Sequence, residues 1–228
     1  MDSSWGCGAG ADPRNGPGYP SRGLFLHASS VVTSRGALLF LGHSTAGKST
    51  MTRLLGARFR VLADDAVFAT RRDDGRWQVV DGGFRYDGGG VADWQQAVHR
   101  SLEAGEGIPL AGCLRIFKAA DVRREPMAPL PLARCLMDAA MEIDVQRKNG
   151  RPSRAHGVDP AEWTPSRDMR RTWFHLAADL ARSCPGWKLW FSRDAHREAL
   201  IRAVCEAAGE GICRTYRESH LGAVAYKG

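Results

Sequence analysis

Residues 38–50 read Leu-Leu-Phe-Leu-Gly-His-Ser-Thr-Ala-Gly-Lys-Ser-Thr, and this stretch decides which fold the chain can adopt. Residues 38–41 form an apolar run of strand length, and residues 48–55 have helix-forming character. Between them, residues 42–49 match the pattern Gly-x-x-x-x-Gly-Lys-Ser. A strand, a glycine-rich turn and a helix in this order are the setting in which that pattern binds nucleotide phosphates. We therefore expect a nucleotide-binding loop at residues 42–49.

The residue types in this loop suit phosphate chemistry. Glycines let successive backbone N–H groups turn toward the phosphates, and the N-terminus of the following helix adds the positive end of its dipole. Lys48 would place a charge at the β- and γ-phosphate oxygens, and the Ser49 hydroxyl would ligate Mg²⁺. The expected nucleotide contacts are Gly42, His43, Ser44, Thr45, Ala46, Gly47, Lys48, Ser49 and Thr50.

Strand-like and helix-like segments alternate around the loop. The expected strands are residues 24–33, 37–41, 60–63, 66–70, 77–80, 114–118 and 187–191. The expected helices are residues 48–55, 91–103, 131–143, 167–183 and 194–208. The alternation predicts an α/β domain with flanking helices, and hairpin turns make its sheet mixed. We expect a flexible N-terminal arm at residues 1–22, which are rich in Gly and Pro, a domain at 23–208 and a C-terminal tail at 209–228.

Two adjacent carboxylates follow the strand at residues 60–63. Asp64 and Asp65 come sixteen and seventeen positions after Lys48, and in a sheet built around the loop they would face the triphosphate. Adjacent strand residues point to opposite sides, so the two carboxylates are expected to have different tasks. One can hold Mg²⁺ while the other accepts a proton from an acceptor hydroxyl. The alternative is that the pair merely ends a strand in a solvated turn.

Two further side chains are candidates for the same site. The hairpin from Leu24 to Leu41 would return its first strand beside the strand that enters the loop, which brings His27 near the phosphates. A cation or a hydrogen-bond donor is useful there. Arg85 lies in a glycine-rich segment and could contact a phosphate or a substrate carboxylate, although a solvated loop position explains it equally well.

Three segments together resemble a known family. Leu26-His27-Ala28-Ser29, the loop at 42–49 and Leu62-Ala63-Asp64-Asp65-Ala66-Val67 resemble the catalytic domain of bacterial HPr kinase/phosphorylase, whose P-loop fold is similar to that of phosphoenolpyruvate carboxykinases. The resemblance is strong over residues 24–70, with the family's interval of 21 residues from His27 to Lys48, and fainter over 77–88, 108–143 and 187–194. It implies that Lys48 and His27 engage the phosphates, Ser49 ligates Mg²⁺ with help from Asp64, and Asp65 activates an acceptor serine.

The chain also departs from that family. The aspartate pair arrives one residue early, and no counterpart of the family's separate N-terminal domain precedes the loop. The family's downstream Glu-Arg-Gly signature, which supplies a further metal carboxylate, has no match, since neither Glu103 nor Glu106 stands in that pattern. These departures put HPr in doubt as the substrate, and reversal of the reaction too. Standalone relatives include kinases that phosphorylate a serine of a ribosomally made peptide, among them lasso-peptide tailoring enzymes, and kinases of free serine.

Composition and charge restrict the partners. The net charge of +7 is spread along the chain instead of forming a stripe interleaved with exposed aromatics, so nucleic acid is not an expected partner. In this interpretation Arg123 and Arg124 are surface charges, and Trp187 and Trp190 belong to the core or to helix faces. No apolar run reaches the roughly 18 residues that span a bilayer, so no membrane partner is expected.

The cysteines and the N-terminus indicate the compartment. The six cysteines are scattered without a Cys-x-x-Cys pair, which predicts thiols in place of disulfides or a zinc site. The N-terminus lacks the apolar core of an export signal. We therefore expect a cytoplasmic protein.

Taken together, the sequence predicts an ATP- and Mg²⁺-dependent kinase that transfers the γ-phosphoryl group to a hydroxyl, a serine of a peptide or protein. The alternatives are a nucleotide-dependent regulator that hydrolyses ATP slowly and a small-metabolite kinase, for example of free serine. A basic nucleic-acid-binding protein that carries such a loop is a weaker one. A homo-oligomer is implied by the family resemblance alone.

Overall fold

The strand that enters the glycine-rich loop, β2 (Gly36–Leu41), is buried from end to end in a computed structural model of the chain, which describes residues 23–82, 91–149 and 166–209. Strand β2 pairs antiparallel with β1 (Gly23–Thr33) and parallel with β6 (Ile108–Lys118). Because β2 has a neighbouring strand on each edge and is packed on both faces, its sequence is a continuous apolar run and does not alternate between polar and apolar residues.

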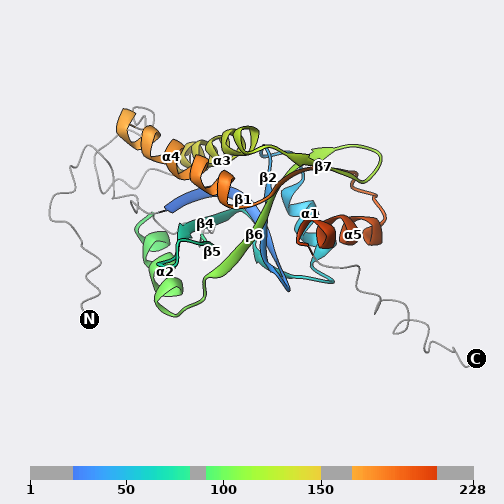
Figure 1. Ribbon diagram of the computed structural model, residues 1–228, viewed down its shortest axis with the longest axis horizontal. Helices are drawn as coiled ribbons and strands as arrows, with labels where there is room; N and C mark the ends of the chain where they lie inside the picture. Colours follow the sequence, from blue (N-terminus) through green and yellow to red (C-terminus); the bar gives the residue numbers. More distant parts are fainter. Residues whose placement is uncertain (1–22, 83–90, 150–165, 210–228) are drawn as a thin grey trace, which may run out of the picture.

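The other elements complete a mixed sheet with helices around it (Figure 1). The remaining strands are β3 (Arg60–Ala63), β4 (Ala66–Arg71), β5 (Trp77–Asp81), β7 (Arg123–Met127) and β8 (Gly186–Phe191). The helices are α1 (Lys48–Leu55), α2 (Val91–Glu103), α3 (Pro129–Asn149), α4 (Arg167–Ser183) and α5 (Arg197–Ala207). The eight-stranded sheet has the order β2-β1-β4-β5-β6-β8-β7, with β3 added to β1. The β2–β6 and β6–β8 pairings are parallel and the others antiparallel, which confirms the predicted α/β class with a mixed sheet.

Strands β1 and β6 are long, and each changes partner along its length. Residues 23–27 of β1 pair with β4, and from Ala28 onward β1 pairs with β2. Strand β6 pairs with β5 at its start and with β2 and β8 further along, so the pairings close a ring through β2, β1, β4, β5 and β6. His27 is therefore the last β1 residue that pairs with β4, one residue before β1 meets the end of β2.

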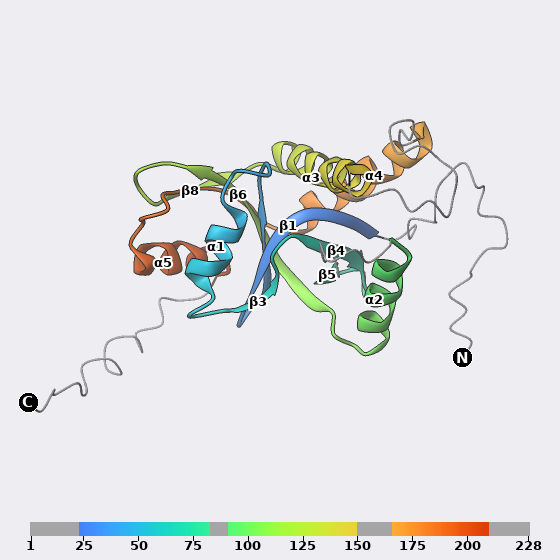
Figure 2. The ribbon, with the colours of Figure 1, turned by 180° about the vertical axis from the view of Figure 1, so that it is seen from behind.

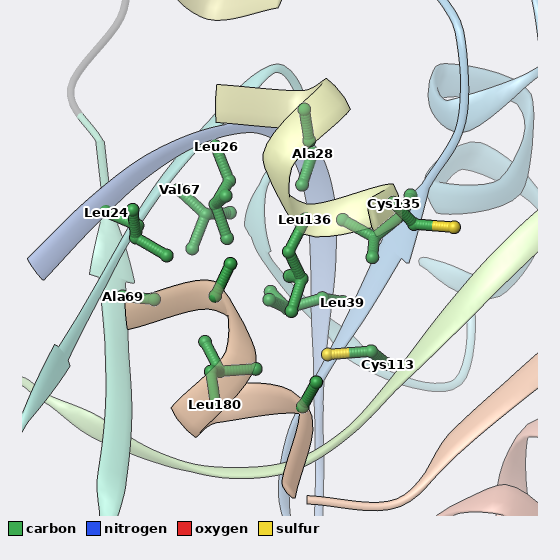
Figure 3. Packing of buried hydrophobic residues seen from close by; sticks show 14 of the residues in the cluster. Leu24, Leu26, Ala28, Leu39, Val67, Ala69, Cys113, Cys135, Leu136 and Leu180 are labelled. Atoms are coloured by element: carbon green, nitrogen blue, oxygen red, sulfur yellow. The ribbon is translucent and has the colours of Figure 1, made fainter. Parts of the chain in front are cut away.

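Helices cover the sheet in groups. Helices α3 and α4 lie on one side, and α1 and α5 lie on the other (Figures 1 and 2). The cluster beneath α3 and α4 draws residues from β1, β2, β4, β5 and β6, and Figure 3 shows Leu136 and Leu180 in the same interior as Leu26 and Val67. A second cluster packs α1 and α5 against β2, β6 and β8. None of the described helices has the length and hydrophobicity needed to cross a bilayer.

Four elements differ most from the sequence prediction. Strand β6 begins at Ile108, six positions before the predicted start, although Pro109 and Gly112 disfavour a strand there. Helix α3 extends the predicted 131–143 at both ends, and α5 starts at Arg197 instead of Asp194. Strand β7, Arg-Arg-Glu-Pro-Met, was not predicted. Among the described strands it pairs with β8 alone, at the edge of the sheet, a position that tolerates charged side chains and proline.

The described cysteines agree with the prediction of thiols. Cys113, Cys135 and Cys184 are buried and carry no disulfide. The Sγ atoms of Cys113 and Cys184 lie 3.8 Å apart, and this contact together with burial raises the pKa of Cys113 well above its usual value. These thiols therefore behave as small apolar core residues.

Candidate functional site

The glycine-rich loop (residues 42–49) connects the end of β2 to the start of α1. Its chain turns back on itself, with the Ala46 N–H donating to the His43 carbonyl at 2.8 Å. Gly47 caps the helix with a left-handed backbone, φ +102°. His43, Ser44 and Thr45 at the tip are exposed, as is Ser49 at the start of α1. The tip and the first turn of the helix are thus open to a ligand from solvent.

Lys48 reaches back across this loop. Its Nζ donates to the carbonyl oxygens of Gly42 at 2.7 Å and His43 at 3.1 Å. The residue is only 4% exposed, and this burial lowers the pKa of the ammonium, while the carboxylates of Glu142 and Asp65 oppose the shift. The charge therefore sits inside the loop.

Gly47 makes a testable demand on the backbone. An alanine at this position would have to adopt the left-handed backbone conformation, and its Cβ atom would lie 3.1 Å from Cζ of Phe191. We expect Gly47→Ala to lower the free energy of unfolding by about 1–2 kcal/mol from the backbone alone, and by more because of the Phe191 contact. Gly75→Ala is the matched control, because Gly75 also has a positive φ, +81°, with no atom within 4 Å of the added Cβ. Equal losses in urea denaturation would contradict the role of Phe191.

Three side chains from different elements meet beside Lys48. His27 of β1 is 3% exposed, with its Nδ1 3.3 Å from Oδ1 of Asp65 and its Nε2 3.8 Å from Oε1 of Glu142. Asp65 lies in the turn between β3 and β4, and its backbone carbonyl accepts the N–H of Ala28 at 3.1 Å. The predicted hairpin thus brings His27 to the end of β2, and the aspartate reaches it from the neighbouring turn.

His27 is neutral at neutral pH in this arrangement. Burial, followed by the positive charge of Lys48, lowers the pKa of His27 from 6.5 to about 4, against an opposing effect of Glu142. Of the two roles that the sequence left open, cation and hydrogen-bond donor, this charge state favours the donor.

The shifted histidine makes stability depend on pH. Between pH 6.5 and about 4, His27 is protonated in the unfolded chain but remains neutral in the folded protein. Its contribution is therefore fully present above pH 6.5 and is lost as the pH falls through this window, by at most ~1.4 kcal/mol per pH unit. We expect urea denaturation to show a weaker pH dependence for His27→Gln across this range. His175→Gln, which changes an exposed histidine of α4, should retain the wild-type slope. A wild-type slope in His27→Gln would refute the assignment.

Asp64 turns away from Asp65, toward α1. Its Oδ1 accepts the hydroxyl of Thr52 at 2.6 Å, so the prediction that the adjacent aspartates face opposite sides is confirmed. The two residues stand in a turn and not within the strand, and the turn separates them. Asp64 and Ser49, the two expected Mg²⁺ ligands, border one surface hollow together with Thr50, Thr52 and Arg53.

Glu142 is a site residue that the sequence did not reveal. It lies on α3 and borders a small cavity beside the loop, which is lined by Gly42, His43, Arg115, Cys135, Asp138, Ala139 and Glu142. Asp138 and Ala139 come three and four positions after Cys135, and Glu142 comes seven positions after it, the spacing of one helix face. The sequence did offer one signal for Glu142, because it is an acidic residue on a face of α3 that otherwise carries core residues. Nothing in the sequence, however, placed α3 beside the loop.

The remaining predicted site residues lie partly inside and partly outside the described ranges. Ala46 is half-buried in the loop, and Thr50 is half-buried in the first turn of α1. Arg85, the N-terminal arm at 1–22 and nearly all of the tail at 209–228 lie outside the described residues. Comparison of the chain with models of protein families and with curated proteins found no match. The functional assignment therefore depends on the residues of the chain and their geometry.

Proposed function

We propose that residues 23–208 form a P-loop domain of the HPr kinase type and transfer the γ-phosphoryl group of ATP to a hydroxyl, a serine of a peptide or protein. The observation that supports this most is the meeting of His27, Lys48, Asp65 and Glu142 at the base of the glycine-rich loop. A loop with a buried lysine suits phosphate binding, and a carboxylate beside it supplies the base that phosphoryl transfer to a hydroxyl requires.

On the donor side, the loop and the first turn of α1 supply the phosphate contacts. The exposed tip and the helix N-terminus offer backbone N–H groups, and Lys48 offers a positive charge that its carbonyl bonds hold inside the loop. When the triphosphate replaces these carbonyls as the partner of Nζ, the ammonium exchanges neutral acceptors for charged ones. This exchange favours binding of a highly charged ligand.

On the acceptor side, Asp65 is the base. The acceptor oxygen attacks the γ-phosphorus while the bond from this phosphorus to the β–γ bridging oxygen breaks, and its electron pair leaves on ADP. The hydroxyl proton passes to the carboxylate of Asp65, a half-buried residue. Neutral His27, 3.3 Å away, positions that carboxylate, and Glu142 approaches the opposite ring nitrogen.

The groups around the loop fit a Mg²⁺ ion. Ser49 offers an exposed hydroxyl and Asp64 an exposed carboxylate on one hollow. Within the described residues no three acidic, histidine or cysteine side chains gather as a protein-built metal site. This suits Mg²⁺, which commonly takes one or two protein carboxylates and completes its shell with waters and substrate phosphates. Bound there, the ion would neutralise charge on the transferring group.

A labelling assay tests the proposed function and separates it from its rivals. The protein is incubated with γ-labelled ATP, Mg²⁺ and a panel of serine peptides, HPr and free serine. We expect label on the serine of a peptide or protein. Transfer to free serine alone would make the chain a small-metabolite kinase, and ATP binding without transfer would make it a regulator. Binding to mixed DNA with a steep salt dependence would favour the nucleic-acid alternative.

A further inference from the structure

One face of strands β6, β8 and β7 carries two rows of large side chains. The pairings β6–β8 and β8–β7 place residues opposite each other, so the side chains line up across the three strands. The first row is Arg115, Lys188 and Glu125, and the second row is Phe117, Trp190 and Arg123. We call these six residues the aromatic–basic face.

The aromatic–basic face lies on the side of the sheet that bears α3. One step earlier along the strands, Cys113 and Met127 pack in the cluster beneath α3, and Gly186 faces Leu132 of that helix. The intervening residues of β6 and β8 point to the opposite side, toward α1 and α5. In Figures 1 and 2, α3 lies beside this end of the sheet and not over it. Helix α3 touches the face at Arg115, whose Nη1 donates to Sγ of Cys135 at 3.4 Å, and all six residues of the face are exposed or half-buried.

Its aromatic rings are already paired with cations. Phe117 and Trp190 stack with centroids 5.2 Å apart and an interplanar angle of 19°. The guanidinium of Arg123 lies 4.4 Å from the Trp190 ring, and that of Arg115 lies 5.1 Å from the Phe117 ring. Lys188 approaches Trp190 at 6.0 Å. Stacking on rings holds the guanidinium planes in place, so their N–H groups are preorganised for a ligand.

The face continues into the candidate site. Arg115 pairs with Leu41, the residue before the glycine-rich loop, and lines the same cavity as Gly42, His43 and Glu142. The carboxyl ends of the parallel strands β2, β6 and β8 thus carry both the loop and the face, and ligands of α/β sheets bind outside such ends. A chain lying on the face would lead directly to the loop.

We propose that the aromatic–basic face docks the acceptor polypeptide through a segment that combines acidic and aromatic side chains near the phosphorylated serine. Within the face three cations, Arg115, Arg123 and Lys188, outnumber one carboxylate, Glu125. Asp138 and Glu142 of α3 lie beside Arg115, so the positive charge that complements an acidic ligand is greatest at Arg123 and Lys188. A nucleic-acid strand fits less well, because Glu125 would meet a phosphate. A peptide can place an uncharged side chain there. The inference deepens the proposed function and rests on it.

The test measures binding separately from catalysis. A fluorescent serine peptide flanked by glutamate and phenylalanine, and its counterpart with glutamine for glutamate, are titrated by anisotropy with the whole chain in the absence of ATP. We expect the acidic peptide to bind more tightly, and Arg123→Glu to weaken it by roughly tenfold, since reversing a charge replaces attraction by repulsion at more than one contact. Arg202→Glu, an exposed arginine on α5, is the matched control and should bind as wild type. Arg123→Gln, with an intermediate loss, guards against a misfolded charge-reversal variant.

The outcomes separate this inference from the proposed function. Tight binding lost in Arg123→Glu, with no phosphoryl transfer by any variant, keeps the docking surface and refutes the kinase. The docking surface is refuted if phosphoryl transfer proceeds equally well on the glutamate and the glutamine peptide. It is also refuted if peptide binding is unchanged in Arg123→Glu and Arg123→Gln. An altered affinity for ATP in Arg123→Glu would assign the face to the nucleotide, and binding of single-stranded DNA instead of the peptide would assign it to nucleic acid. Either result overturns the proposal.

Discussion

Asp65→Asn is expected to slow phosphoryl transfer by about 10²- to 10⁴-fold, the usual contribution of a general base, and to leave ATP binding intact. Asparagine keeps the shape of the side chain beside His27 but cannot accept the proton of the acceptor hydroxyl. The substitution also removes a negative charge beside Lys48, so it adds no repulsion toward the triphosphate. Initial rates with saturating ATP give the first quantity, and calorimetric titration with ATP gives the second.

Asp73→Asn is the matched control for that variant, because Asp73 is exposed in the turn after β4, and its change should preserve the rate. Transfer at the wild-type rate by Asp65→Asn would remove this carboxylate as the base. Loss of ATP binding together with activity would instead indicate that Asp65 supports the loop, and the assignment of the base would then fail as well.

Lys48→Met should weaken ATP binding by about 10- to 150-fold, because a hydrogen bond from a charged donor contributes roughly 1.5–3 kcal/mol. Methionine retains the length and suits the buried position, so the change removes the charge with little loss of packing. The hydrogen bonds to the carbonyls of Gly42 and His43 disappear with it. Calorimetric titration with ATP measures the effect.

The same variant has an internal readout that does not involve ATP. The positive charge of Lys48 lowers the pKa of His27, so in Lys48→Met the pKa of His27 should rise above its value of about 4, as followed by NMR of the ring protons. Lys118→Met, which removes an exposed lysine, should change neither the ATP affinity nor the His27 titration. An unchanged His27 titration in Lys48→Met would contradict the closeness of the two residues.

Local patterns in the sequence were sufficient for most elements of the fold. The apolar run into the loop, the strand predicted at 77–80 after a hairpin turn and the amphipathic helix at 167–183 each rest on local signals, and each is found where it was predicted, with β5 one residue longer. The hairpin that places His27 beside the end of β2 also came from local signals, because a turn at 34–36 fixes the register of its two strands.

The features that the sequence could not supply depend on contacts between distant segments. Strand β7 exists because β8 offers it an edge, and its own residues, Arg-Arg-Glu-Pro-Met, have no strand periodicity. Glu142 joins the site only because α3 packs beside the loop, which no local pattern expresses. The same holds for Trp190, predicted as a core or helix-face residue, which lies on the sheet face opposite the α1–α5 cluster and stacks on Phe117.

The change of partner along β1 has a consequence for how the chain folds. His27 is held through the pairing with β4, whereas the glycine-rich loop is held through β2, so the two halves of β1 must both be paired before His27, Lys48 and Asp65 meet. The β1–β2 hairpin needs only local contacts, but closing the ring and docking α3 join distant segments, which form at a larger cost in chain entropy. Completion of the site therefore coincides with completion of the sheet, and partial unfolding of the β4 half would disconnect the base from an otherwise intact phosphate loop.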